Sequence, residues 1–349
     1  MKFFYLRFLP TLLFAVALAT DTFAQANRFI TYIQAGAVDG SKLTSAYLNP
    51  VMEGFTYGVN GGWSNTAHTH DRLGFDISIS ATGIFFPSSA TTFRPAELGL
   101  TNTTLVGGNG VAPTIVGPEN STVFETTLNT PGGPETINFS GAPGLDFANR
   151  WLVKGITVPM FQAAVGIGKK TDAKLRFIPT VGLGSVTRAG LVGLGFQHDI
   201  KQHIKAWSEK DFDLSLFAGY TRVAGEIQTA VGDFPPAAGD TRAQETPFKV
   251  HAFLVQALIS KQLEAITFYG GVGYNVSKSN AEVLGSYVIF GDGTDNEVVL
   301  TDPLHLSFND NSMRVTAGAR LQIGHFCIYG DYTLQQRSAV TVGIGYTTD

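Results

Sequence analysis

The feature that most constrains the fold of this 349-residue chain is a strict alternation of side chains near its C-terminus. Every second residue from 313 to 323 is apolar, and most of the residues between them are polar or glycine. A repeat of two is that of a β-strand, whose successive side chains point to opposite faces. The pattern resumes at 326–334 and 340–346, with a two-residue turn at Gly324-His325. These segments therefore predict antiparallel strands joined by short connections.

Similar alternation recurs upstream, so that sheet structure is expected along most of the chain. It is clear at 55–64, 74–85, 212–221 and 266–275, and weaker at 154–167, 173–184, 189–199 and 247–260. These segments make eleven strands, whereas single-chain bacterial barrels have even numbers. Either a further strand lies in 27–53 or 100–126, or residues 27–53 thread the lumen. We expect about 12 strands, within 10 to 14.

Two architectures share this alternation, and composition separates them. A soluble sandwich exposes its polar faces to water and usually carries many lysines and glutamates there. Here charged residues make up 15% of the chain, and the polar faces consist mostly of Gly, Ser and Thr. Aromatic residues lie near strand ends, as in the interfacial girdles of membrane barrels. The sequence therefore predicts an all-β, antiparallel transmembrane β-barrel with a short N-terminal helical segment.

The N-terminus predicts export. Basic residues precede the apolar stretch 8–19, which is too short to span a bilayer, and Thr22-Phe23-Ala24 places small residues for cleavage. We expect residues 1–24 to be a signal peptide and the mature chain to reach the outer membrane. Its expected partners are outer-membrane lipid, the barrel insertion machinery and an unknown small-molecule solute. With 24 basic and 28 acidic residues, nothing indicates nucleic-acid binding.

The remaining organisation follows from composition. Residues 25–53 are expected to form a helical segment or plug, with Asp39 as its cap, and residues 54–349 to form the barrel. Long loops are expected at 86–153 and 222–246, with 100–145 partly disordered, and a tall hairpin at 276–311. Barrels place short turns in the periplasm and long loops outside the cell.

Candidate functional residues are those expected to line the lumen. They are Asp76, Ser78, Arg176, Arg314, Arg320, Tyr329 and Asp331. They could form a ligand-selecting cluster, but a neutralised ion-pair network is favoured, because charges in a narrow lumen need partners. The turn at 324–325 pairs residues whose numbers sum to about 649. This register predicts an ion pair between Arg320 and Asp331.

No motif indicates catalysis, a metal or a cofactor. His198 and His203, and likewise His68 and His70, are expected to be solvated turn residues, because their spacings are not those of usual metal ligands. The acidic residues within 292–302 lack the spacing of a calcium loop. No nucleophile motif such as G-x-S-x-G occurs, so no enzyme is expected.

Several sequence blocks resemble an uncharacterised family of Bacteroidota envelope proteins, domain of unknown function 6588. The blocks are 45–67, LGFDISIS (73–80), LRFIPTVGLG (175–184), GLGFQHDIKQ (193–202), FDLSLFAGYT (212–221), YGGVGYNVSKSN (269–280) and 328–346. The resemblance implies an outer-membrane barrel and supplies no ligand. An architectural likeness to outer-membrane transporters of the long-chain fatty-acid type is more distant, and rests on the segment before the first strand.

The sequence is compatible with two functions. The first is a passive outer-membrane channel or transporter for small molecules, hydrophobic ones among them. The alternative is a structural or surface-binding barrel with a closed lumen that acts through its extracellular loops.

Overall fold

The computed structural model describes residues 26–348 except 148–154, 183–186, 229–233 and 292–295. The predicted signal peptide, 1–24, lies outside the described residues. Ten antiparallel strands close into one barrel in the order β1-β17-β16-β15-β12-β11-β10-β9-β8-β7. Their bounds are β1 Phe75–Phe85, β7 Gly155–Gly166, β8 Thr171–Gly182, β9 Thr187–Asp199, β10 Asp213–Gln228, β11 Glu245–Leu263, β12 Ile266–Val283, β15 Leu304–Ile323, β16 Phe326–Leu334 and β17 Ala339–Thr348.

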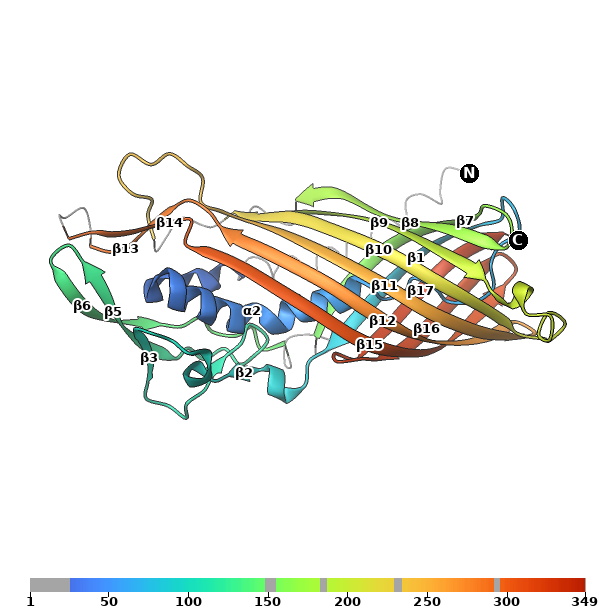
Figure 1. The fold of residues 1–349 in the computed structure, drawn as a ribbon, viewed down its shortest axis with the longest axis horizontal. Helices are drawn as coiled ribbons and strands as arrows, with labels where there is room; N and C mark the ends of the chain where they lie inside the picture. The colour runs from blue at the N-terminus through green and yellow to red at the C-terminus, as the bar shows by residue number, and fades with distance from the viewer. Residues whose placement is uncertain (1–25, 148–154, 183–186, 229–233, 292–295, 349) are drawn as a thin grey trace.

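The expected number of about 12 strands is therefore too high. The segment 55–64 is not a strand, because a short 3-10 helix, η1 (Ala26–Ala35), leads into the helix α2 (Gly36–Val59), which continues to residue 59. α2 contacts β1, β7, β11, β12 and β15, and its C-terminal part lies inside the barrel (Figure 1). A helix enclosed on several sides needs no single apolar stripe, so its sequence can imitate a strand. No helix in the described part of the chain is long and apolar enough to cross a membrane.

The start of α2 also differs from expectation. No side chain caps its first turn. The carboxylate of Asp39 instead accepts hydrogen bonds from the backbone N–H groups of Thr101 and Asn102, at 2.8–3.0 Å. The predicted capping residue therefore ties the helix to a loop.

The two ends of the barrel differ strongly. One end, which we call the short-turn end, carries the connections after β7, β9, β11 and β15 and the short helix η4 (Lys201–His203). The other carries a folded cap (Figure 1). The cap contains η2 Ser88–Ala90, β2 Thr92–Phe93, η3 Pro95–Leu98, β3 Thr103–Val106, β4 Ala112–Pro113, β5 Val123–Thr130, β6 Gly133–Ser140, β13 Ser286–Phe290 and β14 Val298–Thr301.

The cap replaces the expected irregular loop with small sheets. β3, β5 and β6 form one sheet, β2 pairs with β4, and β13 pairs with β14 in the connection between β12 and β15. These sheets enclose an apolar core in which Tyr32 of η1 packs between Tyr47 of α2 and Phe124 of β5. Residues 100–145 are therefore ordered by packing against the N-terminal helices.

The wall is apolar outside and mixed inside. Every barrel strand exposes at least one large apolar side chain, for example Ile77 on β1, Phe177 on β8 and Ile344 on β17. Many inward positions hold Ser, Thr, Gln or charged residues. Other inward positions are apolar, such as Val158 and Val250, and pack near α2. This packing explains the weak alternation of the sequence in β7 and β11.

Candidate functional site

The seven predicted lumen residues are all buried. They come from four strands: Asp76 and Ser78 from β1, Arg176 from β8, Arg314 and Arg320 from β15, and Tyr329 and Asp331 from β16. They do not surround an open pore. The charged members face a plug, by which we mean α2 and the following segment 60–70, which continues through the barrel toward β1.

Two arginines hold the C-terminal end of α2. Arg176 donates from Nη1 to the carbonyl of Val59 at 2.8 Å and from Nη2 to that of Gly61 at 2.7 Å. Arg314 donates from Nη1 to the carbonyl of Asn60 at 2.9 Å. The last carbonyls of a helix lack partners within it and lie at the negative end of its dipole. Two guanidinium groups on opposite parts of the wall therefore satisfy the end of the plug helix.

Trp63 lies directly beyond this helix end. The guanidinium carbon of Arg176 lies 3.8 Å from the centre of its ring, in cation–π geometry, and Phe217 packs at 5.2 Å. A Cβ added at Gly195 of β9 would come within 3.0 Å of both rings. Glycine on the inner wall therefore makes room for the indole of the plug.

Lys174 holds the next part of the plug. Its Nζ donates to the carbonyl of Trp63 at 2.9 Å, to Ser64 Oγ at 2.9 Å and to Gln197 Oε1 at 2.8 Å. Gln197 in turn donates to the carbonyl of Thr66 at 3.0 Å. Lys174 and Gln197 were missed from the sequence because nothing in their own strands indicates a bound polypeptide.

The predicted ion pair between Arg320 and Asp331 is wrong. The register that suggested it is confirmed, since Arg320 lies opposite Tyr329. However, Arg320 donates to Asn65 Oδ1 at 3.1 Å and to Gln322 at 3.0 Å, whereas Asp331 accepts from the Tyr269 hydroxyl at 3.0 Å. The plug supplies the acceptor that the sequence assigned to the neighbouring strand.

The plug is also tied at two further points. Near the short-turn end, His70 Nδ1 lies 3.0 Å from Asp172 Oδ2, and the backbone N–H of His70 donates to the same carboxylate. His70 is buried, so the expectation of a solvated turn is wrong for this residue. Nearer the cap, Arg337 pairs with the buried Glu53 of α2 at 2.8 Å.

The other predicted residues pack within this network. Asp76 interacts electrostatically with Lys174 and Arg320. Ser78 lies opposite Gly345 of β17 and Gln162 of β7. The Tyr329 ring lies across Gly343, where an added Cβ would be 2.3 Å from its Cζ. The network combines buried charges, aromatic rings and plug backbone.

An apolar compartment adjoins the network toward the cap. Val59 packs there with Val158 and Met160 of β7 and Leu191 of β9, and Ile178 of β8 lies against the cluster. Val59 of the plug thus fills this compartment by packing directly against the wall side chains.

The wall beside this compartment has a seam. β7 and β8 pair only from Gln162 opposite Arg176 to Gly166 opposite Asp172. Residues 155–161 and 177–182, all of them described, show no pairing with each other, although each pairs with its other neighbour. Proline interrupts both stretches, at 159 and 179, and cannot donate to a strand ladder. The barrel wall therefore lacks a backbone hydrogen-bond ladder between β7 and β8 next to its apolar lining.

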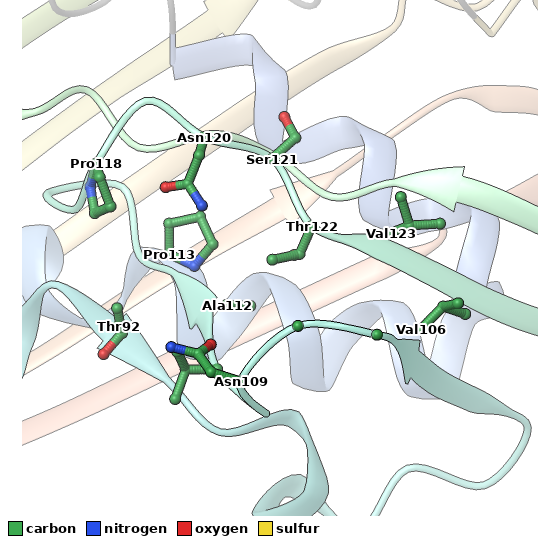
Figure 2. Close-up of a pocket in the computed structure, with 13 residues that line it drawn as sticks. Thr92, Val106, Asn109, Ala112, Pro113, Pro118, Asn120, Ser121, Thr122 and Val123 are labelled. Carbon is green, nitrogen blue, oxygen red and sulfur yellow. The ribbon is translucent and has the colours of Figure 1, made fainter.

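A hollow lies in the cap. It encloses about 410 Å³ between the loops around β2–β5. Figure 2 shows the amides of Asn109 and Asn120 and the side chains of Thr92 and Thr122 around it. No charged side chain lines it.

Metal-binding geometry is not evident in the described residues, where no group of three or more His, Cys, Asp or Glu side chains is arranged to hold an ion. At the short-turn end, the Nε2 atoms of His198 and His203 lie 3.0 Å apart. The acidic residues expected at 292 and 295 lie outside the described part.

The fold and its lumen define a closed, ten-stranded antiparallel β-barrel occupied by its own N-terminal segment. The chain belongs to the family described as "Family of unknown function (DUF6588)", whose model matches residues 1–348.

Two solved structures show low similarity to this chain. The translocator domain of autotransporter NalP from Neisseria meningitidis is 10% identical, with 87% of this chain and 96% of that chain covered and a TM-score of 0.29. The Ralstonia pickettii toluene transporter TbuX is 11% identical, with 81% and 90% covered and a TM-score of 0.23. These scores are too low to support a functional argument.

One curated protein also matches part of the sequence. Acetate kinase 2 of Vibrio cholerae is 29% identical over 136 residues, which cover 37% of this chain and 34% of that protein. The chain thus spans about a third of the length of this relative. A partial match at this identity does not indicate kinase activity.

Proposed function

We propose that this chain is an outer-membrane transporter for small molecules, hydrophobic ones among them, and that the plug closes it in the present state. The membrane setting is supported by the wall, which exposes large apolar side chains on every strand while it buries charged ones inside. This arrangement is the reverse of that in a soluble barrel and suits lipid outside the wall.

The proposal includes an orientation and an export route. The cap would face outward and the short-turn end the periplasm, following the usual distribution of loops in such barrels. Residues 1–24 would be removed as a signal peptide, and the insertion machinery would assemble the strands in the outer membrane of a bacterium of the Bacteroidota. The proposal includes no catalytic activity and no cofactor.

The observation that carries transport is the unpaired seam beside the apolar compartment. An always-open passive channel does not agree with a lumen through which the plug runs. A small apolar molecule, by contrast, could occupy the space between Val158, Ile178 and Leu191 if α2 withdrew. From there the seam between β7 and β8 offers the shortest path toward the acyl chains, because no backbone hydrogen bonds need to break.

The test is a reversible tether between the plug and the wall. A Cβ at Gly58 would lie 3.2 Å from Cβ of Val158, near the separation that a disulfide requires. We therefore choose the double variant Gly58→Cys/Val158→Cys in a Cys327→Ser background, reconstituted in liposomes. Uptake of a fluorescent aromatic hydrocarbon is expected to stop under oxidising conditions and to return on reduction.

The matched control is Cys327→Ser with Val158→Cys alone, which cannot form the tether. Its uptake should not depend on the redox state. If the tethered barrel transports the hydrocarbon as fast as the reduced one, movement of α2 is not required. If neither form exceeds protein-free liposomes, the transport proposal fails.

A second candidate is favoured by the cap cavity alone. A barrel permanently closed by its plug could act by binding a neutral polar molecule between Asn109, Asn120 and Thr122. Removing the loop from 107 to 121 separates the two functions. Loss of surface binding with unchanged hydrocarbon uptake would assign that role to the cap and transport to the lumen.

A further inference from the structure

A row of basic side chains crosses the outside of the barrel on three adjacent strands. Arg222 of β10 lies directly opposite His251 of β11, and His251 lies directly opposite Lys278 of β12. Arg222 and Lys278 are exposed, and His251 is half-buried. Lys249 projects from the same face two residues beyond His251. The register therefore gathers three or four basic groups on one outer patch, which we call the basic row.

The basic row has no acidic partners of its own. None of the described carboxylates lies within ion-pair distance of Arg222, Lys249 or Lys278, although Glu226 pairs with Arg188 higher on the same wall. Lys249 lies one diagonal step from both Arg222 and Lys278 on the same face, and like charges this close on neighbouring strands destabilise a sheet. An anion bound from outside the protein would offset this repulsion.

The row lies at the edge of the apolar belt. Immediately on its short-turn side, the outward positions at the same register are Tyr220, Phe253 and Val276, all exposed. Along β11, nine residues separate His251 from Lys261, the next basic outward residue. A tilted strand needs about 9–11 residues to cross a bilayer. The basic row thus lies where one layer of lipid headgroups would meet the barrel, on the cap side.

A shallow hollow marks the same place. It measures about 160 Å³ and is lined by Tyr220, His251, Phe253, Val276, Ser277 and Lys278. The Tyr220 hydroxyl lies 2.6 Å from Nδ1 of His251, which fixes the imidazole beside the aromatic ring. Basic groups on one side of the hollow and apolar groups on the other match a lipid, whose charged headgroup and acyl chains have the same order.

The geometry points to a binding site for the phosphate headgroup of a lipid in the cap-side leaflet. The phosphate oxygens would accept hydrogen bonds from Arg222 and Lys278, and the acyl chains would run over Phe253 and Val276. This inference rests on the membrane setting of the proposed function, but not on transport. It gives the barrel a fixed lipid partner and a fixed depth in the membrane.

The experiment uses the purified full-length protein in micelles of a neutral detergent, titrated with phosphatidylglycerol and followed by native mass spectrometry. The variant Arg222→Gln/Lys278→Gln should bind this lipid roughly 30-fold more weakly, since each basic residue near a lipid surface contributes about 1 kcal/mol. The control variant, Lys205→Gln/Lys210→Gln, removes the same charge from the short-turn end. It should bind like the unaltered protein.

Two further arms identify the source of the phosphate. Phosphatidylcholine, which lacks net charge, should bind the unaltered protein and the row variant alike, and inorganic phosphate at millimolar concentration should not displace phosphatidylglycerol. Equal affinity of the two variants for phosphatidylglycerol would overturn the site, and full displacement by inorganic phosphate would replace the lipid with a free anion. Because binding is measured in micelles, these outcomes can be interpreted even if transport or membrane insertion fails.

Discussion

Replacing Arg176 with methionine tests whether the buried wall residues hold the plug in place. Arg176 makes three hydrogen bonds, of which two go to the carbonyls of Val59 and Gly61, and it stacks on Trp63. Methionine preserves much of the volume but offers no donor. The substitution would leave two carbonyls at the end of α2 without their partners in a buried site.

The magnitude follows from these contacts. A hydrogen bond from a charged group contributes about 1.5–3 kcal/mol, so the two lost bonds to the helix end amount to roughly 3–6 kcal/mol. Part of this is offset, because the variant no longer buries a guanidinium group away from water. We expect a net loss of roughly 2–4 kcal/mol, concentrated in the interaction between plug and wall.

The assay uses the thiol of Cys327, the only cysteine of the chain. Cys327 is buried on the inner face of β16, and a Cβ at Gly345 would lie 2.9 Å from its Sγ. Its reaction with a water-soluble thiol reagent should be slow in the folded protein and at least about tenfold faster in Arg176→Met, because each loss of about 1.4 kcal/mol raises the population of the opened state about tenfold. The gel shift of the folded barrel on heating reports global unfolding separately.

Arg188→Met is the matched control. Arg188 lies on the outer face of β9, largely exposed, and pairs with Glu226 at 3.2 Å. An exposed ion pair contributes about 0–1 kcal/mol, so this variant should leave the thiol protected. If Cys327 reacts as slowly in Arg176→Met as in Arg188→Met, the buried hydrogen bonds do not retain the plug and the reasoning is refuted.

Other predictions concern the wall, the lumen and the cap. Gly195→Val should displace Trp63, because an added Cβ already comes within 3.0 Å of its ring. A red shift of the tryptophan emission would report this displacement, and an unchanged spectrum would contradict the tight fit. Val342→Arg should cost roughly 2–4 kcal/mol in a bilayer and much less in micelles, and equal losses would argue against lipid outside β17. Hydrogen bonds from Arg242 lower the pKa of Asp240. Their stabilisation of the cap is therefore present above the ordinary aspartate pKa of about 4 and is lost as the pH falls through the lowered value. Proteolysis of the cap should rise at acid pH in the parent but not in Asp240→Asn, and cleavage that does not depend on pH would contradict this.

How far the sequence predicts this molecule depends on whether a contact is encoded in neighbouring strands. Alternation and the short turn at 324–325 predict the pairing of β15 with β16, including Arg320 opposite Tyr329. The partner of Arg320 is Asn65, which is more than two hundred residues away and has no register with β15. Local patterns cannot specify that contact.

The helix α2 also shows that a local sequence pattern can predict the wrong structure. Phe55, Tyr57 and Val59 alternate as in a strand, and only the enclosure of the segment by five strands allows a helix with apolar residues on several faces. The strand count was too high for this reason. An excess of small residues, with Gly54 and Gly58 spaced by one helical turn, is the signal that could have indicated close packing against a wall.

The balance of charge in the lumen explains why the plug is bound through its backbone. Among the described barrel strands, four buried basic side chains, Lys174, Arg176, Arg314 and Arg320, face three buried carboxylates, Asp76, Asp172 and Asp331. Ion pairing within the wall alone would leave positive charge unmatched. The carbonyls at 59, 60, 61 and 63 are therefore needed as acceptors, and any residue can supply a carbonyl. It follows that Gly61 and Trp63 of the plug are constrained mainly by space, whereas the basic residues of the wall are constrained by chemistry. Lys174, Arg176 and Arg314 use these carbonyls, so a ligand that displaces them must present oxygen atoms to the same three cations, or water must enter with it.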